Sequence, residues 1–144
     1  MIKLSLEHFV KTVLQSNEIT RDDMRRLQRD IMPDGVESRD EADVLIALDR
    51  AVTHKHCTWS AFACQSVVDF VVWTSRPTGY VDHETATWLV GSLSAGCGPS
   101  PVAEAIAFEV VREAERVDAA LVAFVMKSAH GRMVEPASDL AFAA

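Results

Sequence analysis

Ile19-Thr20-Arg21-Asp22 and, later in the chain, Val81-Asp82-His83-Glu84 begin two stretches with the same order of apolar, acidic and turn-forming residues. We call the separation in sequence from Ile19 to Val81 the repeat offset. Further positions recur in that order, the second group after one inserted residue: Leu27 and Ile31 with Leu89 and Leu93, then Glu41, Ala42, Leu45 and Leu48 with Glu104, Ala105, Phe108 and Val111. A period that returns all these features indicates one supersecondary unit used twice.

The spacing of apolar residues and of helix-capping residues predicts about seven helices. They are expected at residues 2–16, 20–31, 38–52, 59–73, 82–93, 100–116 and from 118 onward. No segment alternates at period two for long enough to predict a strand. The expected fold is therefore all-α, a single-domain helical bundle with an internal duplication of helix-loop-helix-helix units. Its parts are an N-terminal accessory helix (1–18), a duplicated domain (19–130, with halves 19–73 and 81–130) and a flexible tail (131–144).

The boundaries of these helices rest on capping residues. Thr20 with Asp23 and Ser38 with Glu41 have the spacing of capping boxes. Ser100 is followed by proline, which loses no needed hydrogen bond at the first position of a helix. The fourth expected helix is the most apolar and is predicted to be central, with its four large aromatic residues in the core: Trp59, Phe62, Phe70 and Trp73.

Composition narrows the classes of partner. A chain of 144 residues can bury a core of its own, and a net charge of −7 repels the phosphates of nucleic acids and of anionic lipids. The longest uncharged run, 85–103, is broken by glycine and proline and does not suit a membrane span. The three cysteines cannot all pair, and residues 1–18 lack the apolar core of a signal peptide. The expected location is the cytoplasm.

The first candidate site is the acidic loop from Asp30 to Glu41. Counted as a twelve-residue calcium loop, it places Asp30 at position 1, Asp34 at position 5 and Glu41 at position 12. Position 3 is Met32, which offers no oxygen ligand, and helix capping by Ser38 and Glu41 explains the same residues structurally. The loop predicts either a calcium or magnesium site at Asp30, Asp34 and Glu41 or an ordinary capped turn.

The order of an Asp-Gly turn, a Glu-led amphipathic helix, an aromatic-rich helix and a weaker second copy resembles the TerB-like domains of the tellurite-resistance family. The residues that carry the resemblance are Asp34-Gly35-Val36-Glu37-Ser38, Glu41, Leu45 and Leu48, and in the second copy Val81, Glu84, Leu89, Gly98 and Glu104. It covers roughly residues 19–130. The resemblance implies a helical bundle without established catalysis, associated with stress responses, in which acidic residues bind a metal or a partner. Asp34 and Glu41 are the matching positions.

Histidine and cysteine residues form a second candidate metal site. His54, His56, Cys57 and Cys64 could supply soft ligands, although they match no standard zinc spacing. In the alternative interpretation the two histidines lie in a polar loop and Cys64 is a small core residue.

Cys97 is the third candidate, because it lies between two glycines just before a helix N-terminus. Backbone amides and the helix dipole lower the pKa of a thiol in such a place, as in nucleophilic or redox-sensing cysteines. His83 and His130 are available as bases, but the sequence does not place either beside the sulfur. A glycine-rich loop with a small residue inside it explains the same pattern without chemistry.

Basic residues gather once, at Arg21, Arg25, Arg26 and Arg29. On an acidic chain this cluster is interpreted as a solvated face that pairs with neighbouring aspartates. The expected function is a non-enzymatic stress-response or interaction module that binds a protein partner, with homo-oligomerisation left open. The alternative is a small enzyme or redox sensor that uses Cys97.

Overall fold

Helices dominate the computed structural model, which describes residues 4–74, 78–95 and 100–128. Six helices are α1 (Leu4–Ser16), α2 (Arg21–Arg26), α3 (Arg39–Ala51), α4 (Trp59–Asp69), α5 (His83–Ser94) and α6 (Pro101–Glu113). The π-helical turns η1 (Leu27–Ile31) and η2 (Phe70–Thr74) continue α2 and α4. A seventh helix spans residues 119–128, called helix 119–128 below. The predicted all-α bundle of about seven helices is confirmed. The expected tail, 131–144, lies outside the described residues.

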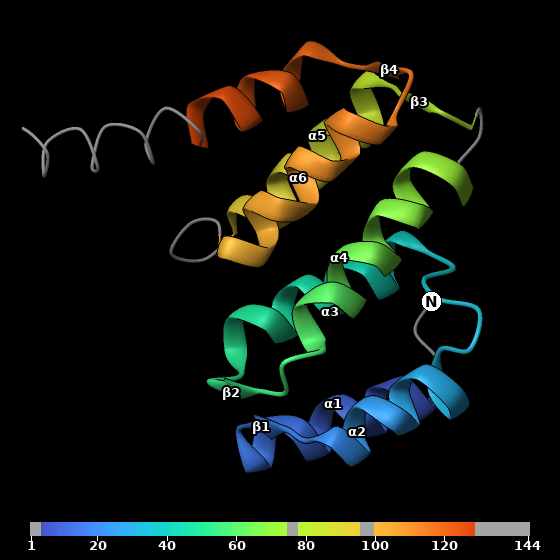
Figure 1. Cartoon of the computed structure of the whole chain (residues 1–144), viewed down its shortest axis with the longest axis vertical. Helices are drawn as coiled ribbons and strands as arrows, with labels where there is room; N and C mark the ends of the chain where they lie inside the picture. Colours follow the sequence, from blue (N-terminus) through green and yellow to red (C-terminus); the bar gives the residue numbers. More distant parts are fainter. Residues whose placement is uncertain (1–3, 75–77, 96–99, 129–144) are drawn as a thin grey trace, which may run out of the picture.

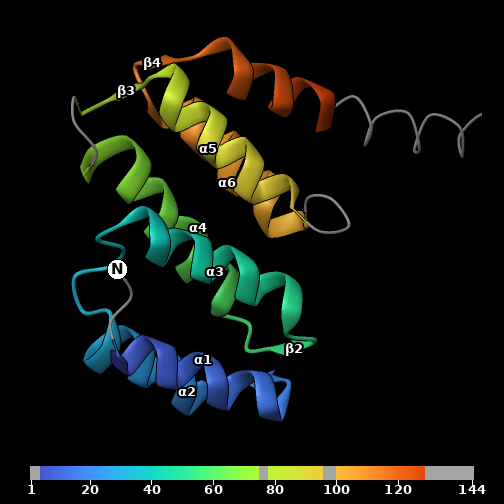
Figure 2. The same cartoon turned by 180° about the vertical axis from the view of Figure 1, so that it is seen from behind.

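The helices form three layers, in which α1 lies beside α2, α3 beside α4, and α5 beside α6 (Figures 1 and 2). Helix 119–128 lies at the end of the molecule, next to the α5 and α6 layer. The apolar face of α1 is buried, so this helix belongs to the core. No helix among the described residues is both long enough and apolar enough to cross a membrane.

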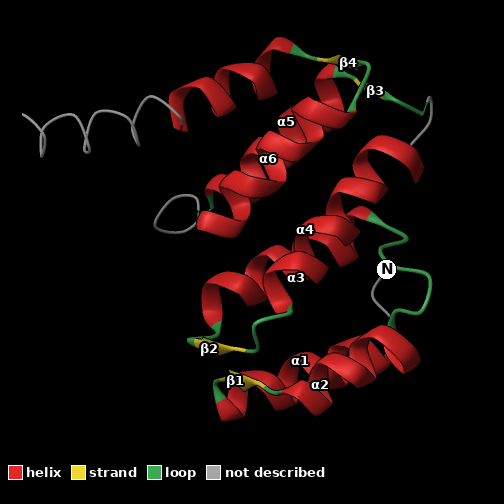
Figure 3. Cartoon of the chain, viewed as in Figure 1, coloured by secondary structure: helices red, strands yellow, loops and turns green. Residues whose placement is uncertain are grey.

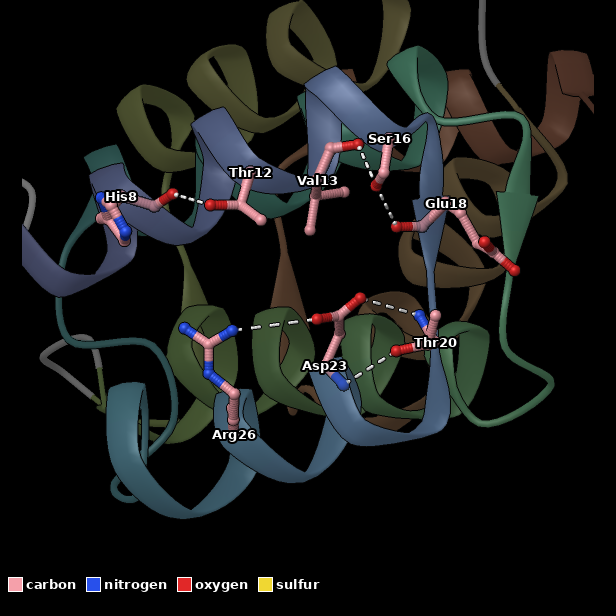
Figure 4. A network of polar contacts seen from close by, with 8 residues as sticks. All are labelled: His8, Thr12, Val13, Ser16, Glu18, Thr20, Asp23 and Arg26. Carbon is pink, nitrogen blue, oxygen red and sulfur yellow. Dashed lines mark hydrogen bonds and ion pairs between the residues drawn. The ribbon is translucent and has the colours of Figure 1, made fainter.

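Side-chain caps start the helices where the sequence predicts them. The Thr20 hydroxyl accepts a hydrogen bond from the Asp23 backbone N–H, and the Asp23 carboxylate accepts one from the Thr20 N–H (Figure 4). The Ser38 and Ser100 hydroxyls accept from the third residue of α3 and of α6 in the same way. Local polar chemistry therefore sets the start of each of these helices.

Four two-residue strands were not predicted: β1 (Glu18–Ile19), β2 (His54–Lys55), β3 (Tyr80–Val81) and β4 (Arg116–Val117). They form two parallel pairs, β1 with β2 and β3 with β4, at the ends of the helical layers (Figure 3). The backbone N–H of His56 donates to the Ile19 carbonyl at 2.8 Å, and that of Asp118 donates to the Val81 carbonyl at 2.9 Å. Each strand pair therefore holds the beginning and the end of a helical segment side by side: β1 and β2 flank the segment from α2 to α3, and β3 and β4 flank the segment from α5 to α6.

The same contacts recur at the repeat offset, which stays constant along the described chain. It relates β1 to β3, β2 to β4, and the caps Ser38 and Ser100. It also relates Asn17 and Gly79, whose positive φ angles of 55° and 84° turn the chain into β1 and β3. An origin of the two halves by duplication stays a prediction.

The predicted one-residue insertion is wrong for the described helices. It placed Leu45 over Phe108, yet Phe108 is 52% exposed. Ala107, which lies at the repeat offset from Leu45, is fully buried in α6. The sequence pattern favoured Phe108 because it is the larger apolar residue. In the structure the small Ala107 occupies the core position and the large Phe108 faces solvent.

The most apolar helix is central, as predicted, because α4 packs against both α3 and α6. Trp59 is fully buried, whereas Phe62 and Phe70 are half-buried at the edge of the core. Trp73 was expected in the core but is 48% exposed, and its indole N–H lies 3.4 Å from a Glu113 carboxylate oxygen. It follows the change from α4 to η2, and the wider π-helical turn rotates later side chains away from the α-helical stripe.

We expect Gly79→Ala to lower the free energy of unfolding by about 1–2 kcal/mol, because a Cβ is disfavoured at φ +84°. Gly79→Asn should cost less, since Asn17 adopts the corresponding left-handed conformation. Urea denaturation followed by circular dichroism measures both. Gly91→Ala is the matched control, because it lies inside α5 with open space around the added Cβ and should gain up to about 1 kcal/mol. Equal effects at positions 79 and 91 would contradict the expectation.

Candidate functional site

The acidic loop connects η1 to α3. Asp30 and Asp34 are exposed, whereas Glu41 is buried in the first turn of α3. One carboxylate oxygen of Glu41 accepts a hydrogen bond of 2.8 Å from the Glu37 backbone N–H, so this side chain holds the loop against the helix. Among the described residues, no three or more His, Cys, Asp or Glu side chains come together as a group that could hold a metal ion. The cation site at Asp30, Asp34 and Glu41 stays a prediction.

Titration with calcium, magnesium and zinc, followed by thermal unfolding, tests this site. A cation bound only to the native state at one hundred times its dissociation constant would add about 2.7 kcal/mol. If Asp34 is a ligand, Asp34→Asn should remove the increase, whereas the matched variant Asp22→Asn on exposed α2 should keep it. No change in melting temperature with any of the three ions would refute the hypothesis.

The histidine and cysteine candidates lie on different elements. His54 is in β2, and the His56 ring nitrogen Nδ1 lies 2.9 Å from the Thr58 hydroxyl. The exposed Cys57 sulfur is 3.9 Å from the same ring nitrogen. Cys64 instead lies on α4, half-buried and packed against the core. The structure pairs His56 with Cys57 but brings no group of three such ligands together among the described residues.

The two described cysteines should differ in reactivity. Burial raises the pKa of the Cys64 thiol, and the negative charges of Glu109 and Glu113 on α6 raise it further. We expect iodoacetamide at neutral pH to label the exposed Cys57 at least about tenfold faster than Cys64, because the thiolate is the reactive form. Mass spectrometry of tryptic peptides gives the rate at each residue. The two rates should converge in denaturant, and equal rates in the native protein would contradict the structure.

Cys97 and His130 lie outside the described residues. His83, the other base considered for Cys97, has its Nδ1 atom 3.1 Å from an Asp118 carboxylate oxygen. The backbone N–H of Ala120 also donates to Asp118, and together with His83 it holds the pKa of that carboxyl below its usual range. His83 and Asp118 thus join the start of α5 to the start of helix 119–128.

The arginine cluster forms a solvated face, as predicted. Arg21, Arg25 and Arg29 are exposed, and Arg26 lies 3.9 Å from Asp23 (Figure 4). This face is part of α2 and η1, away from the grooves described below.

A buried carboxylate that sequence reasoning missed is Asp49, near the end of α3. Its oxygens accept hydrogen bonds from the Trp59 indole N–H at 3.0 Å and from the Ser100 hydroxyl at 2.6 Å. The Lys55 ammonium lies 3.4 Å away and also donates to the Asp49 backbone carbonyl at 2.6 Å. These contacts tie α3 to α4, to β2 and to the cap of α6. The signal available in the sequence for this buried carboxylate was an acidic residue next to the apolar stripe of α3.

A second polar cluster joins α3 to α5. One oxygen of Asp43 accepts from the Trp88 indole N–H at 3.1 Å and from the Ser92 hydroxyl at 2.6 Å. The Arg39 guanidinium lies 5.3 Å from the centre of the Trp88 ring. Asp43, Trp88 and Ser92 also line an open groove of about 490 Å³ between the two helices. The cluster stabilises the junction of the halves.

A further groove lies between α5 and helix 119–128, and we call it the terminal groove. Its volume is about 580 Å³, and it is lined by Val90, Ser94, Ala120, Ala123, Phe124, Lys127 and Ser128. Lys127 alone carries a charge among these lining residues. Two large apolar side chains of the same helix are exposed, Val122 at 37% and Met126 at 67%. The terminal groove therefore combines an apolar floor with a single cation.

No protein-family model, no curated protein and no solved structure matches the chain. The resemblance to the TerB-like domains stays a prediction, and function is inferred from the geometry of the described residues.

Proposed function

We propose that the protein is a non-enzymatic interaction module whose protein partner binds at the terminal groove. The observation that carries this proposal is a groove of about 580 Å³ whose lining is mostly apolar, on a helix that also exposes Val122 and Met126. Contiguous apolar surface on a folded domain marks a binding site more often than chance exposure does. A stress-response role in the cytoplasm, and kinship with TerB-like domains, belong to the same proposal and rest on the resemblance at Asp34 and Glu41.

The carboxylates of the two polar clusters bond to neighbouring parts of the fold, so they stabilise the scaffold. They are therefore not offered to a ligand in the terminal groove, which supports an interaction role for that groove. Asp49 and Asp43 direct their carboxylates at the neighbouring helices and not at the terminal groove. Among the described residues, every buried side-chain nitrogen and oxygen atom has a hydrogen-bond partner. The terminal groove is then a surface that can gain free energy from a partner, because burial of apolar area drives association.

Affinity capture from a lysate of the source cells tests the proposal. Immobilised wild-type chain is compared with Met126→Glu, which places a charge on an exposed residue of helix 119–128 next in sequence to the lining residue Lys127, and with Leu4→Glu, a matched change at a residue of α1 that is 80% exposed. We expect at least one protein to be retained by wild type and by Leu4→Glu and to be lost with Met126→Glu. The same proteins on all three columns, or none on any, would refute the proposal. Thermal unfolding confirms that the variants fold.

A further inference from the structure

Helices α1, α3 and α5 lie side by side on one face of the molecule, with α3 in the middle (Figure 2). We call this surface the α3 face, and its residues on α3 are Asp43, Val44, Ala47, Arg50 and Ala51. On the α5 side of α3 lies the open groove of about 490 Å³. On the α1 side a second, apolar groove of about 130 Å³ is lined in part by Val10 and Leu14. Ala47 lines both grooves, so the exposed side of α3 stands between two depressions.

Two opposite charges on the α3 face, Asp43 and Arg50, form no ion pair with any residue that the structure describes. They are about two helical turns apart, so they lie on the same side of α3 and both line the larger groove. Both hydrogen bonds to Asp43 reach its Oδ1 atom, which leaves Oδ2 toward the groove's open side for a further donor. The Arg50 guanidinium donates to the Ser92 carbonyl at 3.0 Å and keeps further N–H donors. Each side chain is thus held in place and still has a charge to offer.

Opposite charges at two points of one helix face are complementary to themselves under a two-fold rotation. A rotation axis that passes close to Ala47 and lies across α3 reverses the direction of the helix, so Arg50 of each copy meets Asp43 of the other. We propose that the α3 face binds a second copy of this chain, in a dimer whose two α3 helices cross at Ala47 in antiparallel directions. This interface shares no residue with the terminal groove, so it goes beyond the proposed function.

The shape of the α3 face suits this arrangement. Gly91 lines the larger groove on α5, and a Cβ added to it would meet no atom within 4 Å, so the groove has room for the Arg50 side chain of the second copy. On the other side of α3, Leu14 is 47% exposed. Helices α1 and α3 run in the same direction, because both end at the pair of strands β1 and β2. The rotation therefore places Leu14 near Val10 and Val44 of the second copy, where its apolar surface is buried.

Sedimentation velocity of the full chain over a range of concentrations tests the proposal. We expect wild type to show an equilibrium between monomer and dimer. Gly91→Gln fills the larger groove without removing a side-chain hydrogen bond, and Leu14→Asp places a charge in the apolar contact, so each should weaken the dimer at least about tenfold. The matched controls are Ala105→Gln at an exposed residue of α6 and Leu4→Asp on α1, which should leave the dimer unchanged. Circular dichroism and thermal unfolding confirm that all four variants fold.

A double-mutant cycle tests the pairing of the charges. Asp43→Asn keeps an oxygen that accepts the same hydrogen bonds within the chain, and Arg50→Gln keeps an N–H donor for the Ser92 carbonyl. Each single variant breaks both of the ion pairs in a symmetric dimer, so each should weaken it about fivefold to tenfold. The double variant loses the same two pairs, so it should be about as weak as one single variant and not as weak as the product of the two effects.

Several results would overturn the inference. Wild type that stays monomeric up to about 1 mM has no such dimer at the weak end of specific affinities. A dimer that Gly91→Gln and Leu14→Asp leave intact does not use the α3 face, and independent effects of Asp43→Asn and Arg50→Gln would mean that these residues do not pair. A dimer that Met126→Glu abolishes would belong to helix 119–128 instead. Loss of a lysate partner with Met126→Glu, while the dimer persists, is the result expected if both proposals hold.

Discussion

Asp49→Ala is expected to lower the free energy of unfolding by about 3 kcal/mol, because it leaves a buried donor without its acceptor. The Trp59 indole N–H is inside the core, and Asp49 is the acceptor 3.0 Å away. The same change removes the contacts of Asp49 with Lys55 and with the Ser100 cap of α6. Urea denaturation followed by tryptophan fluorescence measures the loss.

Two variants distinguish the loss of the hydrogen-bond acceptor of Trp59 from the loss of a negative charge. Asp49→Asn keeps an oxygen that can accept from Trp59, so its effect should be clearly smaller. Asp22→Ala removes an exposed carboxylate from α2 and should change stability by no more than about 1 kcal/mol. If Asp49→Ala were as mild as Asp22→Ala, Asp49 would not hold α3, α4 and α6 together.

Phe9→Ala should cost about 3–5 kcal/mol, because the Phe9 ring on α1 is fully buried and its removal leaves a cavity. The sequence predicted α1 as an accessory helix, and an accessory helix could unfold alone. If α1 belongs to the core, far-ultraviolet circular dichroism and tryptophan fluorescence should report one coincident urea transition at a lower midpoint.

The control for Phe9 is Leu4→Ala on the same helix. Leu4 is 80% exposed, and its truncation should change stability by less than about 0.5 kcal/mol. An early circular dichroism transition, followed by a fluorescence transition that Phe9→Ala leaves unchanged, would show that α1 unfolds separately and would contradict the expectation.

The start of a helix could be predicted from sequence because its chemistry is local. Thr20 and Asp23 are three residues apart, and so are Ser38 and Glu41, which is the distance at which a side chain reaches the first free backbone N–H groups. Glu41 then departs from a simple box, because its carboxylate accepts from the N–H of Glu37 in the loop. That choice depends on how the loop folds over α3.

Features made by distant residues were harder to predict. A two-residue strand such as β1 has no periodicity of its own, and it exists because β2 lies beside it. Asp49 looks like an ordinary charged residue until folding brings Trp59 and Ser100 to its two oxygens. Trp73 has the right spacing for the core, but η2 turns it outward.

The candidate metal ligands show the same division. Asp30, Asp34 and Glu41 match part of a ligand spacing along the chain, whereas a metal site requires oxygens that converge in space. The terminal groove has no such linear pattern, since α5 and helix 119–128 contribute its two walls from different parts of the second half. Spacing could suggest the first site and could not suggest the second.

The sequence by itself determined that the chain is helical, where its helices begin, and that its pattern returns at the repeat offset, because propensity, capping and amphipathic spacing act over a few neighbouring residues. Only the tertiary structure decided that Ala107 and not Phe108 faces the core, and that Lys127 lines a groove against α5. Burial depends on which helix lies against which. In this protein α6 packs against α4, and α5 forms one wall of the groove that helix 119–128 lines.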